Sequence, residues 1–81
     1  MGMVLPVSAF VHVHVKAGKV EDVLRNIKEV GGVKEAYAVT GEFDIIAKAE
    51  ADDLRALGET VTKKIQGIDG VSSTVTSVIV A

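Results

Sequence analysis

The chain has 81 residues, with 9 lysines and arginines against 11 aspartates and glutamates, no cysteine and a hydrophobic fraction of 48%. This length fits one small domain, and the lack of cysteine excludes a disulfide framework and a thiolate metal site. The basic residues are scattered around a net charge of −2, and no apolar run reaches the roughly 18 residues that a membrane-spanning helix needs. We therefore expect a cytoplasmic protein that binds neither nucleic acid directly nor a membrane.

The first predicted element is a β-strand. Residues 1–7 form a short lead, and Pro6 stands just before the alternating pattern. Over residues 9–16 one face carries Val11, Val13 and Val15, while the other face carries Phe10, His12, His14 and Lys16. This period of two is typical of a strand that is apolar on one side.

An amphipathic helix and a β-hairpin are predicted next. Residues 19–30 place apolar side chains at helical spacing, and two glycines predict the end of this helix before residue 33. Residues 33–40 and 43–51 then predict two strands, joined by a tight turn at Gly41 and Glu42. In the second of these strands Ile45 and Ile46 point to opposite faces, so both faces carry apolar side chains.

A second helix and a fourth strand complete the chain. Ala51 or Asp52 is the expected N-cap of the helix. Its apolar stripe consists of Leu54, Leu57, Val61 and Ile65. Gly58 inside this helix lowers its stability by about 1 kcal/mol relative to alanine. A close contact between helices is one reason for a glycine at this position. Residues 71–80 are rich in β-branched side chains and predict the last strand.

The order β-α-β-β-α-β predicts an α+β, ferredoxin-like fold. The segments "EVGGV" and "GIDGV" both leave a helix through glycine into a strand, so the two halves echo each other. Right-handed crossovers then give a four-stranded antiparallel sheet in the order 4-1-3-2, with both helices on one face. Because the uncovered face is also partly apolar, we expect it to be buried in a sheet-to-sheet dimer of two-fold symmetry.

Few side chains suggest chemistry. His12 and His14 share a strand face without a third ligand, which favours interface residues over a metal pair or a general base. No nucleophile–base arrangement and no phosphate-binding glycine motif is present, so we predict no catalytic residue, metal or cofactor. The turn at residues 40–44 offers backbone donors, a hydroxyl and carboxylates that suit a zwitterionic amino acid, although a turn alone also explains it.

Two segments, "AYAVTGEFDIIAKAEA" and "IDGVSSTVTSVIV", resemble the C-terminal ligand-binding module of the Lrp/AsnC family of transcriptional regulators, the RAM (regulation of amino acid metabolism) domain. The first matches the family hairpin V-T-G-x-[YF]-D and the second its closing strand P-G-V-x-x-T-x-T. The resemblance runs from Ala9 to Val80. We therefore expect residues 1–81 to form a single RAM domain without a helix-turn-helix.

This resemblance implies dimers that assemble into octamers or similar rings, with amino-acid effectors bound between the dimers. It implies a non-enzymatic module that modulates transcription by binding amino acids or by co-assembling with a DNA-binding family member. The ligand-binding residues that it implies are Val39, Thr40, Gly41, Glu42, Phe43, Asp44, Thr74 and Thr76. The sequence departs from the family pattern at Ser77, where a bulkier residue is more common, at Asp69, where proline is common, and at His12 and His14.

Two alternatives remain open at this point. Dimeric α+β barrels with the same topology include oxygenases and isomerases, in which His12 or His14 would act as a base in a cavity between sheet and helices. Valine, leucine and isoleucine fill that space here, which favours a non-enzymatic protein. The other alternative is a purely structural assembly module.

Overall fold

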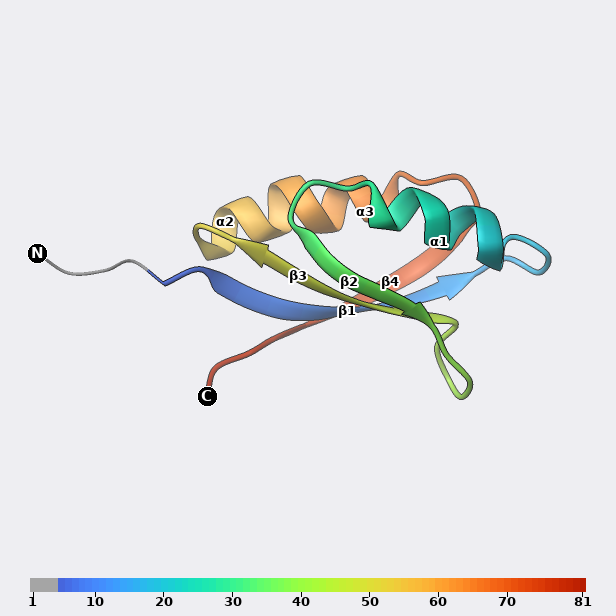
Figure 1. Ribbon diagram of the computed structural model, residues 1–81, viewed down its shortest axis with the longest axis horizontal. Helices are drawn as coiled ribbons and strands as arrows, with labels where there is room; N and C mark the ends of the chain where they lie inside the picture. The colour runs from blue at the N-terminus through green and yellow to red at the C-terminus, as the bar shows by residue number, and fades with distance from the viewer. Residues whose placement is uncertain (1–4) are drawn as a thin grey trace, which may run out of the picture.

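A computed structural model describes residues 5–81, apart from the side chain of Thr60, and shows one sheet with its helices on one side (Figure 1). Residues 1–4 of the expected N-terminal lead lie outside the described part. The strands pair antiparallel in the order β2-β3-β1-β4, as predicted. The elements in chain order are β1 (Val7–Val15), α1 (Val20–Lys28), β2 (Val33–Ala38), β3 (Ile45–Ala51), α2 (Leu54–Ala56), the π-helical segment η1 (Leu57–Thr62), α3 (Lys63–Gln66) and β4 (Val71–Val78).

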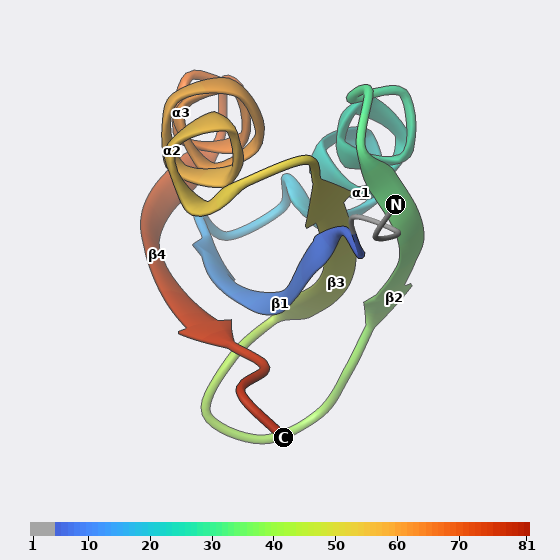
Figure 2. The same cartoon turned by 90° about the vertical axis from the view of Figure 1, so that its left-hand side faces the viewer.

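The hydrophobic core lies between the sheet and the helices. The end-on view shows the sheet curving around the two helical segments, which lie side by side over it (Figure 2). The strand residues of the core follow the predicted alternation, and every buried side chain in the described part of the chain is apolar. The core consists of Ala9, Val11, Val13, Val23, Ile27, Ala36, Ile45, Ala47, Ala49, Leu57, Val61 and Ile65.

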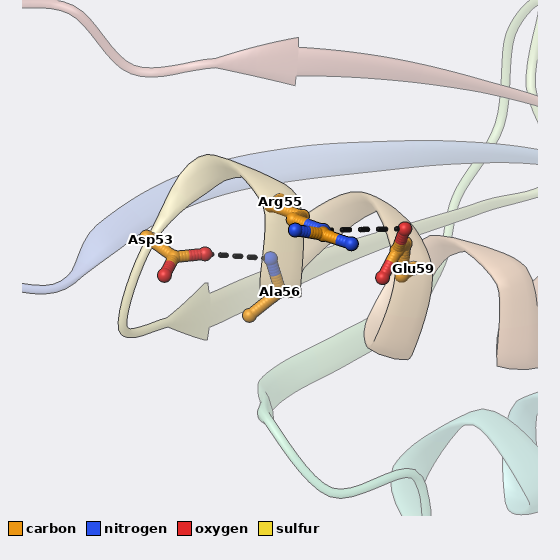
Figure 3. Close-up of polar contacts among 4 residues, drawn as sticks. All are labelled: Asp53, Arg55, Ala56 and Glu59. Atoms are coloured by element: carbon orange, nitrogen blue, oxygen red, sulfur yellow. Dashed lines mark hydrogen bonds and ion pairs between the residues drawn. The ribbon is translucent and has the colours of Figure 1, made fainter.

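The second helical segment differs from its prediction at its start. Its N-cap is Asp53, one residue later than expected, because the Asp53 carboxylate accepts a hydrogen bond from the Ala56 backbone N–H at 2.7 Å (Figure 3). An exposed ion pair between Arg55 and Glu59 follows on the outer surface, with 3.5 Å between Nε and Oε1 (Figure 3). Such an exposed pair adds little stability.

The buried stripe of this segment was also predicted wrongly at one residue. Leu54 is 61% exposed, whereas Leu57, Val61 and Ile65 are buried. Leu57 and Val61 lie in η1 and Ile65 in α3, which are the parts of the segment that pack on the sheet. Leu54 is the first residue of α2, directly after the N-cap Asp53, and lies ahead of that packed part. The expected close contact at Gly58 is absent, since a Cβ atom built there meets nothing within 4 Å.

The two helix-to-strand junctions have the same construction, as the sequence echo predicted. Gly32 and Gly70 both have positive φ angles, of 96° and 100°, and each immediately precedes the first residue of a strand. In both junctions that first residue, Val33 or Val71, donates its backbone N–H to a carbonyl three residues back at 3.1 Å. A Cβ atom at Gly32 would lie 2.8 Å from Val61 Cγ2, so this junction also packs against the other helix.

Candidate functional site

The connection between β2 and β3 is a six-residue loop, residues 39–44, and not the tight two-residue turn that we expected. β2 ends at Ala38 and β3 begins at Ile45, so both strands are shorter than predicted. In both ribbon views the loop leaves the sheet on the side away from the helices (Figures 1 and 2). The Val39 N–H donates to the Asp44 carbonyl at 2.9 Å and closes the base of this loop.

Asp44 ties the loop to the central strand β1. Its backbone N–H donates to the Val13 carbonyl at 2.9 Å, and its carboxylate Oδ2 accepts a hydrogen bond from the Val15 backbone N–H at 2.8 Å. The pairing of β1 with β3 ends at Val13 and Ile45, so the Val15 N–H has no strand partner on that side. The Asp44 side chain supplies an acceptor for this half-buried backbone donor.

Phe43 folds back from the loop onto the face of the sheet opposite to the helices. Its ring centroid lies 5.0 Å from that of His12 and 4.4 Å from that of His14, and both ring pairs are tilted. These distances are typical of packed aromatic rings. The loop is therefore anchored by backbone hydrogen bonds at its base and by an aromatic contact near its end.

Between these anchors the loop presents polar groups to solvent. Thr40, Gly41 and Glu42 are exposed, while Val39 is half-buried. Among the described residues, no hydrogen bond uses the backbone N–H of Thr40, Gly41, Glu42 or Phe43. The loop thus combines available N–H donors with the Thr40 hydroxyl and the Glu42 carboxylate.

The two threonines of the predicted site lie on the other face of the sheet. Thr74 and Thr76 pair with Val13 and Val11 of β1, whose side chains belong to the core. Accordingly, the Gln66 amide donates to the Thr74 hydroxyl at 3.0 Å, and the hydroxyls of Thr62 and Thr76 are 3.5 Å apart. One chain therefore does not bring these threonines together with the loop.

The face without helices, here called the open face, has an apolar centre. The strand register places Tyr37, Ile46, His12 and Val75 in one row across all four strands. Phe10, Tyr37 and Val75 are 39%, 57% and 51% exposed, which is high for side chains of this size in a small domain. Tyr37 and Val75 were not predicted from the sequence as residues of the open face. The predicted strand order, together with the alternation of side chains along β2 and β4, is sufficient to place both of them on that face.

Two polar contacts modify this open face. The Ser77 hydroxyl lies 3.3 Å from His12 Nε2. The Tyr37 hydroxyl donates to the Glu35 carboxylate at 2.8 Å, and this hydrogen bond and the negative charge of Glu35 raise the pKa of the Tyr37 phenol above 10.

His12 and His14 do not line a cavity between the sheet and the helices, as an enzyme of the barrel type would require. They lie on the open face, and apolar side chains fill the opposite side of the sheet. A surface groove of about 360 Å³ runs along the outer edge of β2, where Lys28, Lys34 and Tyr37 line it, and it contains no predicted site residue.

Metal-binding clusters and membrane-spanning helices are both absent from the described residues. These residues contain no group of three or more histidine, aspartate or glutamate side chains placed to hold a metal ion. No helix in residues 5–81 has the length and apolar character to cross a bilayer.

Comparison with known proteins places this geometry in a family. The family model described as "Lrp/AsnC ligand binding domain" matches residues 8–81. An HTH-type transcriptional regulator of Methanocaldococcus jannaschii is 33% identical over 66 residues, which is 82% of this chain and 45% of that protein. A homocitrate synthase of Sulfurisphaera tokodaii is 39% identical over 57 residues, or 70% of this chain, but these make up only 12% of the enzyme.

Solved structures agree with this relationship. A Thermus thermophilus protein superposes with a TM-score of 0.86 at 31% identity, over 93% of this chain and 94% of that one. Escherichia coli AsnC gives a TM-score of 0.85 at 29% identity, and a Neisseria meningitidis transcriptional regulator in complex with L-Met gives 0.82 at 25% identity. Both matches cover 93% of this chain and about half of the regulator, 51% and 50%. The chain therefore belongs to the Lrp/AsnC family of transcriptional regulators, and residues 8–81 are its ligand-binding domain.

Proposed function

We propose that this chain is a non-enzymatic regulatory module whose loop of residues 39–44 binds an amino-acid effector. The observation that carries the proposal is the construction of the loop. Asp44 and Phe43 hold it against β1, while Thr40, Gly41 and Glu42 stay exposed with free backbone donors. A binding loop held in this way loses little conformational entropy when its ligand arrives.

The polar groups of the loop match the two charges of a zwitterion. The backbone N–H groups of residues 40–43 are donors for an α-carboxylate, and the Glu42 carboxylate is an acceptor for an α-ammonium group. Asp44 also supports the loop through the bond of its Oδ2 to the Val15 N–H, and its other carboxylate oxygen stays a predicted ligand contact. The likeness to a regulator whose structure contains L-Met supports an amino acid as the ligand class.

The placement of the two threonines supports a site shared between chains. Thr74 and Thr76 lie on the helix side of β4, and the loop lies on the open face. A single pocket that uses both sets must therefore take them from different copies. We infer that copies pair through their open faces and that these dimers assemble further, alone or with a DNA-binding family member, with the effector between them.

A thermal-shift screen with the twenty amino acids tests effector binding. A ligand present at about 100 times its dissociation constant stabilises its protein by about 2.7 kcal/mol, which this method resolves easily. We expect stabilisation by at least one amino acid and its loss in Glu42→Gln. No shift with any of the twenty at millimolar concentration would overturn the effector proposal.

Sedimentation of an Ile46→Asp variant tests pairing through the open face. Ile46 lies in the central row of this face, whereas Ile45 is fully buried in the core, so an Ile45→Asp change would unfold the protein instead. Leu54→Asp is a matched control, because it places the same charge at an exposed leucine of α2. We expect Ile46→Asp to be monomeric and Leu54→Asp to sediment as the unmodified protein does. An Ile46→Asp variant of unchanged size would contradict this pairing.

The similarity to a homocitrate synthase segment favours a second candidate function. The same kind of module could bind an effector on behalf of a biosynthetic enzyme instead of a DNA-binding regulator. Both candidates predict the same effector binding and differ only in the partner. Co-purification of the tagged chain with a family regulator, or instead with a biosynthetic enzyme whose activity then changes with the effector, distinguishes them.

A further inference from the structure

The two histidines of the chain form one cluster with Phe43 in the middle of the open face. His12 and His14 are both half-buried and come from β1, a central strand. The Phe43 ring contacts both imidazoles, and Ser77 lies against His12 from β4. Nothing in the proposed effector chemistry uses these imidazoles, so their position at the apolar centre of the face needs another explanation.

We propose that His12 and His14 make self-association through the open face depend on pH, with the neutral imidazoles required for pairing. This inference rests on the open-face dimer of the proposed function. A histidine side chain ordinarily changes its charge between pH 5 and 8. A charged imidazole buried between two apolar faces loses its hydration without gaining an equivalent partner, so the charged form favours the separate chains.

The surroundings of the cluster offer little compensation for such a charge. The central row contributes only Ile46, Val75 and the Tyr37 phenol, and β4 has no titratable residue. Asp44, across from His14, has its Oδ2 bonded to the Val15 N–H, whereas His12 faces Ile46 and Val75 and has no carboxylate across from it. The remaining charged groups of the open face and the loop beside it are Lys16, Glu35, Glu42, Lys48 and Glu50. Lys48 is itself a cation, and Glu35 lies one row away, where it accepts the hydrogen bond from the Tyr37 hydroxyl.

The same cluster links pairing to the loop of residues 39–44. Phe43 is the part of the loop that touches the open face, and both of its aromatic contacts are to the histidine side chains. Protonation of these imidazoles therefore affects both the dimer surface and the Phe43 contact that anchors the loop of residues 39–44. We expect acidification to weaken association and to change the environment of Phe43 together.

Sedimentation velocity at about pH 7.5 and about pH 5.5 tests the inference. The dissociation constant of the dimer should rise at least tenfold at the lower pH. The double variant His12→Gln/His14→Gln removes every imidazole from the chain, since it has only two histidines, and keeps a polar group at each position. It should pair with the same affinity at both pH values. The single variants should each keep part of the effect, and circular dichroism checks that each remains folded.

The outcomes separate this inference from the proposal beneath it. A dimer of equal affinity at both pH values would overturn the role of the histidines and leave the pairing intact. A pH effect that persists in the double variant would assign it to groups other than the imidazoles and also overturn the inference. A monomer at both pH values would remove the open-face dimer itself, and with it this inference.

Discussion

The carboxylate of Asp44 and the backbone N–H of Val15 form a 2.8 Å hydrogen bond between residues 29 positions apart in sequence. This bond joins the loop to β1, a strand to which the loop is not covalently adjacent. The acidic residue of the family hairpin motif, Asp44, therefore has a structural role within its own chain through its bond to Val15.

Asp44→Ala should destabilise the fold, because it leaves the half-buried Val15 N–H without an acceptor. The expected loss is about 1–3 kcal/mol in the free energy of unfolding, measured by urea denaturation. Asp44→Asn is the matched control, since its amide oxygen can accept the same hydrogen bond without the charge. If Asn and Ala cost the same, the Asp44 contribution is electrostatic and the hydrogen bond is unimportant.

The contacts of Gly32 predict that alanine at this position destabilises the fold by more than the strain of the positive φ angle alone would. A Cβ atom at Gly32 would lie 2.8 Å from Val61 Cγ2 and 2.9 Å from the Glu50 carbonyl oxygen. At Gly18 φ is also positive, at 82°, but an added Cβ meets nothing within 4 Å. We expect Gly18→Ala to cost about 1–2 kcal/mol and Gly32→Ala about 2–4 kcal/mol in unfolding free energy.

This pair of variants isolates the close approach between the first helix-to-strand junction and η1. Both substitutions carry the strain of a positive φ, so only the difference between them reports the contact. Equal losses in parallel urea titrations would mean that Val61 and the Glu50 carbonyl move aside at negligible cost.

Gly58→Ala should stabilise the protein. Gly58 lies within η1, is exposed, and has open space where a Cβ atom would stand. Alanine in a helix interior is favoured over glycine by about 0.5–1 kcal/mol. Thermal unfolding at fixed protein concentration should show a rise of a few degrees in the midpoint. A fall would mean that η1 requires glycine for its wider turn.

The hydrogen bond between Tyr37 and Glu35 predicts that the stability of the folded protein falls at alkaline pH, when the Tyr37 phenol loses its proton. Glu35 raises the pKa of Tyr37 above 10 in the folded protein, through its hydrogen bond first and its charge second. A folded-state pKa above the unfolded value favours the protonated phenol, so this stabilisation is present below about pH 10 and is lost as the pH rises through the folded-state pKa. Tyr37 is the only tyrosine, so the tyrosinate absorbance follows it alone.

Glu35→Gln should lower the midpoint of that titration toward the ordinary tyrosine value. Glu21→Gln, on α1, is the control that removes one negative charge without touching Tyr37. An equal decrease in both variants would show that net charge, and not the Glu35 contact, sets the pKa.

The element order, the strand order and the core strand residues could be predicted because alternation and helical spacing are local properties of the sequence. Val11 and Val13 or Ile45 and Ala47 are buried as their pattern requires. Leu54 was assigned wrongly because it is the first residue of α2, ahead of the part of the segment that packs on the sheet, and helical spacing alone does not show where that packing begins.

The loop of residues 39–44 could be predicted in composition but not in shape. The motif covers the residues that form the loop, yet a two-residue turn was expected because Gly41 is a strong turn signal. The longer loop depends on tertiary contacts, namely Asp44 with Val15 and Phe43 with the two histidines. Such contacts join positions about 30 residues apart, which local patterns do not encode. The membership of Thr74 and Thr76 in the site stays a prediction.

The hydrogen bonds of the 39–44 loop to β1 connect the loop to a strand other than β2 and β3, which it joins in sequence. β1 pairs with β3 on one side and β4 on the other, so it is the strand through which the two halves of the molecule are joined. A displacement of the loop would therefore act first on β1, where the two halves pair.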